Sequence, residues 1–120
     1  MNPSKKIVFE VYIIPKLNKR QRYICFIIDS ISKPIKLEKK DLFYEIQKLC
    51  KSKYNKDYKE MGLRLIRFDG FWGIIKCNHI EKEKTISLLN SIININSNNI
   101  QVKTLGTSGT IKTLIKKYKK

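Results

Sequence analysis

The order of apolar and polar positions predicts a mixed pattern of strands and helices along most of the chain. Residues 22–29 are apolar on both alternating faces, which is typical of a central strand covered on both sides. Residues 38–52 carry apolar side chains at helical spacing between charged ones and are predicted to form the first helix. Residues 62–69 and 71–77 are two short β-rich runs around Asp-Gly, the signature of a hairpin.

The second half of the chain continues this alternation. Residues 79–93 are predicted to form the second helix, with Asn78 and Glu81 at the spacing of a capping box. A polar, turn-rich break follows, and residues 100–104 then alternate as a strand buried on one face. A basic amphipathic helix over about residues 108–118 closes the chain, and its apolar stripe is Ile111, Leu114, Ile115 and Tyr118.

This element order predicts an α+β fold. Strand, helix, hairpin, helix, strand is the β-α-β-β-α-β order of a ferredoxin-like sandwich with an antiparallel sheet, here with an extra C-terminal basic helix. Two helices cover one sheet face in that fold, so the second face of the strand over 22–29 needs the terminal helix or a partner protein as its cover. We expect one domain over residues 20–120, preceded by an extension and basic connector over 1–19, in which residues 7–14 have the pattern of a strand.

The charge points to a polyanionic partner. The 120 residues contain 26 Lys and Arg against 10 Asp and Glu, a formal net charge of +16, and nucleic acid is the first expectation. The absence of Ala and the excess of Ile, Lys and Asn indicate genomic base-composition bias, so part of this charge carries little functional information. No apolar run approaches the length of a membrane span, and we expect a cytoplasmic protein with no membrane partner.

The lysine-rich runs differ in whether they also contain acidic residues. Residues 36–41 and 81–84 interleave acids with lysines, as ordinary solvated helix faces do. Residues 16–22 and 103–120 contain no acid at all. These two runs are the candidate RNA-facing surface, supplemented by Arg64 and Arg67 if the hairpin face is open.

Residues able to carry out catalysis or to hold a metal are few. His79 is the only histidine, lies at a helix start with no acid or nucleophile placed to assist it, and is expected to be exposed or capping. Cys25, Cys50 and Cys77 lie far apart and are expected to be small buried hydrophobic residues rather than a disulfide framework or a zinc site. The acids show no metal-binding cluster, so we expect no catalytic residue and no metal ligand.

Two glycine-containing segments resemble nucleotide-binding motifs only in part. Residues 106–109 precede a helix as a phosphate loop does, but the Gly-Lys-Ser/Thr ending is missing. A helix N-terminus with Ser108, Thr110 and Lys112 suits an RNA phosphate, while a plain helix cap with a glycine turn is the alternative that this segment alone favours. In the register of an RNA-recognition motif the second stacking aromatic falls on Gly73, so Phe71 and Trp72 are interpreted as hairpin and core residues.

An ordered set of short motifs resembles a known family. The basic connector, Arg22-Tyr23-Ile24, residues 67–69, residues 73–77 and the closing Ser-Gly-Thr-Ile-Lys over 108–112 are similar to the archaeal and eukaryotic ribonuclease P protein component 2 family, the relatives of the yeast Pop five protein. The resemblance covers about residues 14–118.

The resemblance implies an RNA-recognition-motif-related sandwich that is not catalytic by itself. It implies a subunit of ribonuclease P, the endoribonuclease whose RNA removes the 5′ leader of precursor tRNA with magnesium, while the protein binds no cofactor. The implied partners are the ribonuclease P RNA, protein component 3, which shares the support of the RNA catalytic domain, other holoenzyme proteins and, indirectly, precursor tRNA.

The residues expected to contact RNA are taken from the matching family positions and from the acid-free basic runs. Arg22, Lys76 and residues 108–112 match family positions, although Lys76 stands where the family has Arg and lacks its bidentate geometry. The full set expected at the RNA is Lys16, Lys19, Arg20, Arg22, Lys76, Ser108, Gly109, Thr110, Lys112, Lys116 and Lys117.

Two other classes share the predicted topology. A ferredoxin-like regulatory domain that binds a small metabolite needs a polar pocket between elements and no such surplus of lysine. An acylphosphatase-like enzyme needs an arginine-bearing glycine loop after the first strand, where this chain reads Asp-Ser-Ile-Ser-Lys-Pro over residues 29–34.

Overall fold

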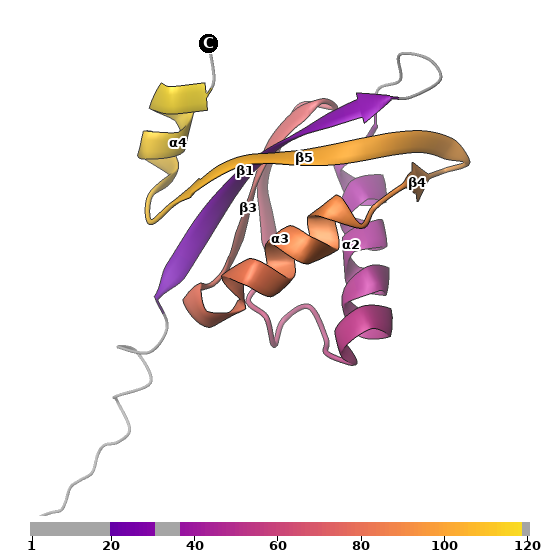
Figure 1. Cartoon of the computed structure of the whole chain (residues 1–120), viewed down its shortest axis with the longest axis horizontal. Coiled ribbons are helices and arrows are strands. Elements are labelled where there is room, and N and C mark those ends of the chain that lie inside the picture. Colours follow the sequence, from indigo (N-terminus) through magenta and orange to yellow (C-terminus); the bar gives the residue numbers. More distant parts are fainter. Residues whose placement is uncertain (1–19, 31–36, 119–120) are drawn as a thin grey trace, which may run out of the picture.

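The computed structural model describes residues 20–30 and 37–118, which form an antiparallel sheet with helices on both faces (Figure 1). The elements in chain order are β1 (Gln21–Ser30), α2 (Lys39–Tyr54), β2 (Arg64–Phe68), β3 (Trp72–Asn78), a 3-10 turn η1 (His79–Glu81), α3 (Lys82–Asn90), β4 (Asn94–Ile95), β5 (Asn98–Ser108) and α4 (Ile111–Tyr118). The predicted extension over residues 1–19 lies outside the described residues.

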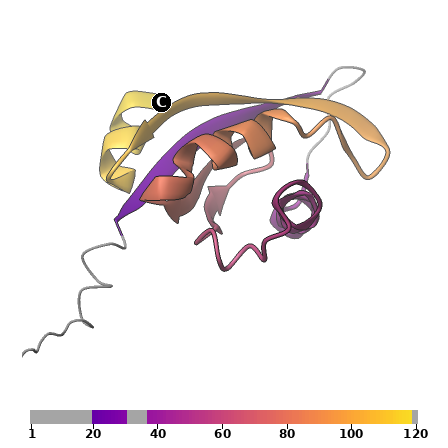
Figure 2. The same cartoon turned by 60° about the horizontal axis from the view of Figure 1, so that its bottom comes forward.

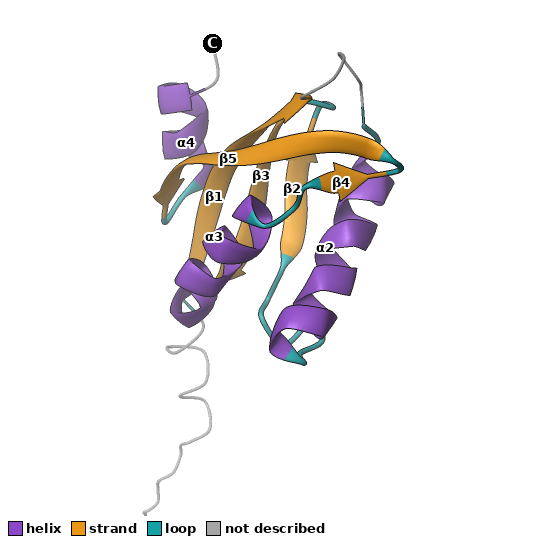
Figure 3. Cartoon of the chain, turned by 45° about the vertical axis from the view of Figure 1, so that its right-hand side comes forward, coloured by secondary structure: helices purple, strands orange, loops and turns teal. Residues whose placement is uncertain are grey.

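The sheet has the strand order β2-β3-β1-β5-β4, with β1 in the centre (Figure 3). Omitting the two-residue β4, this is the order of a ferredoxin-like sandwich, as predicted, and every pairing is antiparallel. The β4–β5 hairpin turns at Asn96 and Ser97, both of which have positive φ (53° and 66°). A two-residue turn of this kind matches the twist of the strands, so the polar break becomes a tight hairpin.

One face of the sheet packs against α2 and α3. Ile24, Phe26 and Ile28 of β1 point to this face and are at most 4% exposed. They meet the buried stripes of the two helices, among them Leu42, Ile46, Leu88 and Leu89. Figure 2 shows α3 and α2 together below the sheet and α4 apart from them.

The other face of β1 is covered by α4. Cys25, Trp72, Ile74 and Leu114 form a second buried cluster, against which Tyr23, Ile27, Ile111 and Tyr118 pack. The predicted cover on both faces of the central strand is therefore confirmed, and within the described residues the terminal helix supplies it.

The second predicted helix differs most from the structure. The α-helix proper covers only Lys82–Asn90 and is preceded by the 3-10 turn η1. The predicted capping box is wrong, because the Asn78 side chain makes no cap and donates instead to the Glu60 carbonyl (3.3 Å). Glu81 is 5% exposed and pairs with Lys56 (2.9 Å), since burial of a carboxylate requires a charged partner.

The last strand is longer than predicted. β5 continues through Gly106 to Ser108, because these residues still pair with Cys25 and Tyr23 of β1. Gly106 leaves room for the terminal helix: a Cβ here would lie 2.7 Å from Cζ of Tyr118, so a larger residue would displace the Tyr118 ring. The glycine turn expected over 106–109 is thus strand up to Ser108, and α4 begins only at Ile111.

Docking of α4 gives the first testable prediction. Leu114→Ala removes the side chain that is 1% exposed against Cys25 and Ile74 and should lower the free energy of unfolding by about 2–4 kcal/mol, limited by what docking of the helix contributes. Urea unfolding followed by circular dichroism measures this. Lys116→Ala, on the exposed side of α4, is the control, and equal stabilities of the two variants would contradict the docking described.

Candidate nucleic-acid interface

The described parts of the two acid-free runs, residues 20–22 and 103–118, meet at one end of the sheet. Tyr23 of β1 pairs with Ser108 of β5, so the start of β1 lies beside the end of β5 (Figure 1). Gly109 follows directly, and a Cβ there would lie 3.2 Å from Nη1 of Arg22. Antiparallel pairing thus brings residues 20–22 next to the segment that leads into α4.

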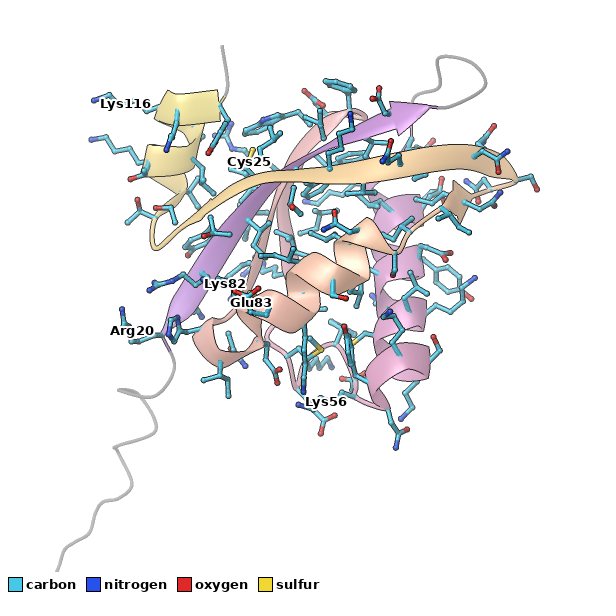
Figure 4. All side chains as sticks on the ribbon, viewed as in Figure 1. Arg20, Cys25, Lys56, Lys82, Glu83 and Lys116 are labelled. Carbon is cyan, nitrogen blue, oxygen red and sulfur yellow. The ribbon has the colours of Figure 1, made fainter. Side chains whose placement is uncertain are left out.

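A second contact adds basic residues from the start of α3. The backbone N–H of His79 donates to the Arg20 carbonyl (2.8 Å), which holds η1 against the first residues of β1. The charges of Arg20, Arg22 and Lys82 all act on the His79 ring, so the four side chains lie in one region; Figure 4 labels Arg20 and Lys82 there. We call Arg20, Arg22, His79 and Lys82 the sheet-end cluster.

The positive charge of the sheet-end cluster is compensated only at Lys82. Burial lowers the pKa of His79 below its ordinary value, and the charges of Arg22, Arg20 and Lys82 lower it further. Lys82 lies 3.6 Å from Glu83, whereas no ion pair among the described residues involves Arg20 or Arg22. An arrangement of this kind attracts phosphate.

The helix α4 presents a separate basic face. Leu114 is buried, while Lys112, Lys116 and Lys117 are exposed on the side away from the sheet. Lys116 is labelled at the outer edge of this helix in Figure 4. The three lysines have no ion pair among the residues described, so they are available to a polyanion.

The hydroxyls before α4 act as local caps. Ser108 Oγ accepts from the Thr110 N–H (3.2 Å). Thr110 Oγ1 accepts from the Thr113 N–H (3.4 Å) and lies 2.8 Å from Thr113 Oγ1. The alternative that the segment alone favoured, a helix cap, is therefore present, and a phosphate role for Ser108, Gly109 and Thr110 stays a prediction.

Lys76 does not join the sheet-end cluster. It pairs with Tyr23 and Arg64 across neighbouring strands, whereas Arg22 pairs with Cys77. Because adjacent residues of a strand point to opposite faces, Lys76 and Arg64 lie on the α4 side of the sheet and Arg22 on the α3 side. Lys16 and Lys19 lie outside the described residues.

The hairpin residues are placed as interpreted. Trp72 is 7% exposed in the second cluster, and Phe71 is 53% exposed at the hairpin. A Cβ at Gly73 would lie 2.6 Å from Cζ of Phe26, so the Phe26 ring packs directly against the glycine backbone. Arg67 lines a hollow of about 370 Å³ together with Lys39, Asp69 and Trp72.

The cysteines are buried hydrophobic residues, as predicted. Cys25, Cys50 and Cys77 are fully buried, and burial raises the pKa of each thiol. Within residues 20–30 and 37–118 no group of three His, Cys, Asp or Glu side chains is placed to hold a metal ion. No helix of that part of the chain is long and apolar enough to cross a membrane.

Sequence reasoning missed Lys82 and His79. Lys82 belongs to a run with interleaved acids, and nothing in that run shows that its first lysine lies near His79. The proximity depends on the β1–η1 hydrogen bond, which joins residues far apart in the sequence.

Fold and surface together define a ferredoxin-like domain with a strongly basic surface at one end of its sheet. The Rpp14/Pop5 family matches residues 22–119, and the chain belongs to this family. It is 32% identical over 104 residues to ribonuclease P protein component 2 of Archaeoglobus fulgidus, covering 87% of this chain and 93% of that protein. The protein of the same name from Methanosarcina barkeri is 28% identical over 107 residues, covering 88% of this chain and 77% of the relative.

A solved structure has the same fold. A chain in the cryo-EM structure of yeast ribonuclease MRP superimposes with a TM-score of 0.59 at 16% identity, covering 77% of this chain and 76% of that chain. At this identity the likeness concerns the fold alone, and it agrees with the ferredoxin-like architecture predicted from the element order.

The sheet-end cluster predicts a measurable shift at the single histidine. Arg22→Ala removes one of the positive charges that lower the pKa of His79 and should raise that pKa toward its ordinary 6.5. A pH titration of the His79 ring proton by NMR measures it. Lys39→Ala on α2 is the control and should leave the pKa unchanged, and an unshifted pKa in the Arg22 variant would contradict the proximity of Arg22 and His79.

Proposed function

We propose that this chain is a protein subunit of ribonuclease P that binds and stabilises the catalytic domain of the RNA. The observation that carries the proposal is family membership over residues 22–119, with relatives named ribonuclease P protein component 2. The geometry supports the part assigned to the chain, because two basic runs separated in sequence meet at one end of the sheet.

The chain's contribution in this proposal is electrostatic. Lysines on α4 and the arginines of the sheet-end cluster neutralise phosphates and so allow RNA segments to approach one another. The catalyst is the RNA with Mg²⁺, acting on the 5′ leader of precursor tRNA in the cytoplasm. The protein holds the fold of that RNA rather than the reacting atoms.

Protein component 3 is the proposed protein partner. Because α4 packs on the second face of β1, an open apolar sheet does not support this partner, and the proposal rests on the family resemblance alone. Exposed apolar side chains elsewhere, Ile80 (81%) and Ile93 (73%) at the two ends of α3, give a protein partner somewhere to pack. Nothing in the comparisons supports the metabolite-binding alternative.

Reconstitution tests the function directly. Adding the full chain, together with component 3, to ribonuclease P RNA should increase cleavage of precursor tRNA at moderate Mg²⁺, because neutralised phosphates reduce the Mg²⁺ needed to fold the RNA. The measurement is the rate of 5′-leader release with and without the chain. An unchanged rate over a range of Mg²⁺ concentrations would refute the proposal.

The sheet-end cluster makes a separate prediction about affinity. Arg20→Ala with Arg22→Ala should weaken RNA binding and reduce the slope of log affinity against log salt by about one unit for each phosphate that is no longer neutralised. Titrations at several salt concentrations measure the slope. The matched control is Lys39→Ala with Lys53→Ala, which removes two exposed charges from α2, and equal slopes in both double variants would remove the cluster from the interface.

A further inference from the structure

The outer surface of α2 carries an aromatic and basic stripe that the proposed interface does not use. Tyr44, Gln47, Lys48 and Lys51 recur three or four residues apart and therefore share one helix face. After α2 the chain reverses at Asn55, whose φ is 54°, and returns with Asp57 and Tyr58 beside this face. A groove of about 480 Å³ lies between helix and loop, lined by Tyr44, Gln47, Lys48, Lys51, Ser52, Asp57 and Tyr58.

The two tyrosines of the groove have different roles. Tyr58 is half-buried and held edge-to-face against Phe43, with ring centroids 5.3 Å apart, so it forms a fixed wall. Tyr44 is 66% exposed and packs against nothing in the core. An exposed ring that lines a groove offers a stacking surface, and little backbone entropy is lost on binding because the residue is part of a helix.

The lysines are placed for a phosphate attached to a stacked base. Lys48 Nζ lies 5.9 Å from the centroid of the Tyr44 ring and 3.2 Å from Glu45, so it stays near the ring. Lys51 is exposed, and in residues 20–30 and 37–118 no ion pair involves it. An aromatic ring beside ammonium groups is the combination with which proteins bind single-stranded nucleic acid, because the ring stacks on a base and the ammonium groups attract its phosphate.

The remaining groups suit the edge of a base. Gln47 offers both a donor and an acceptor. Asp57 is fixed in position, because its Oδ2 accepts from the Lys59 N–H (3.3 Å) and its own N–H donates to Glu60 (2.9 Å). Unpaired RNA bases are recognised by stacking together with hydrogen bonds to such edges.

We propose that this groove binds one unpaired nucleotide of RNA, with its base on Tyr44, its edge toward Gln47 and Asp57, and its phosphate at Lys48 and Lys51. The proposal rests on the proposed function, since it assumes that the chain binds RNA. An acidic peptide is the other anion that lysines attract, but acidic side chains offer no ring to stack on Tyr44, whereas a base offers a ring to Tyr44 and N–H groups that donate to Asp57.

The groove is remote from the interface described above. Figure 1 shows α4 and α2 at opposite ends of the molecule, with the sheet and α3 between them. A chain that uses both surfaces contacts RNA at two separate places: phosphates of any sequence at α4 and the sheet-end cluster, and an unpaired nucleotide at α2.

Binding of the full chain to a labelled single-stranded RNA heptamer and to a blunt-ended RNA duplex, which has no unpaired base, tests the proposal. Tyr44→Ala should weaken heptamer binding about tenfold, as expected for loss of one stacked base, and duplex binding by less than twofold. Tyr44→Phe keeps the ring and should bind within twofold of the parent. Lys48→Ala with Lys51→Ala should weaken heptamer binding more than the control Lys39→Ala with Lys53→Ala.

Each outcome is decisive. An equal heptamer affinity for the parent chain and Tyr44→Ala overturns the groove proposal. A glutamate-rich peptide that competes as effectively as RNA also overturns it, as does a dimer of the chain that Tyr44→Ala abolishes, because a second copy would then occupy the groove. The same tenfold effect of Tyr44→Ala in an Arg20→Ala, Arg22→Ala background supports it. Failure of the parent chain to bind either RNA overturns the proposed function itself, whereas normal duplex binding with no effect of Tyr44→Ala on heptamer binding overturns only the groove.

Discussion

The rest of the structure depends on burial of β1 from both sides. Ile24, Phe26 and Ile28 point to one face and Cys25 and Ile27 to the other, so a single covering layer leaves half of the strand in contact with water. At about 25 cal/mol per Å² of apolar surface, several exposed side chains of this size would cost an appreciable part of a small domain's stability. The helices α2 and α3 satisfy one face, and α4 is required on the other.

That requirement also organises the basic surface. For α4 to reach the second face, β5 must run the full length of β1 and end beside its first residues, which places Ser108 opposite Tyr23. The lysines of α4 and the arginines at the start of β1 thereby come to the same end of the sheet, with Arg22 on the α3 side and α4 on the other. The charged interface is thus a by-product of covering an apolar strand, and its position follows from strand pairing rather than from attraction among like charges, which repel.

Much of this architecture can be predicted from sequence, because strand β1, helix α2, the hairpin at Asp69 and helix α4 are each determined by local periodicity. Features that depend on residues far apart in the chain cannot be predicted in this way. Glu81 has the spacing of a capping residue, yet it pairs with Lys56, which is 25 positions away. Lys76 and Arg22 both look like members of one basic set until the register places them on opposite faces. The groove beside α2 exists only because the chain reverses at Asn55.

The second apolar cluster has a practical consequence. Trp72 is the only tryptophan of the chain, and its indole is packed in the layer that α4 closes. Its fluorescence therefore reports on the local environment under the terminal helix without an added label. Release of that helix would expose the indole to water and shift the emission to longer wavelength, while the α2–α3 layer, which contains no tryptophan, would contribute no emission change of its own. In the chain alone or bound to RNA, the emission of this one residue therefore distinguishes a docked terminal helix from a displaced one.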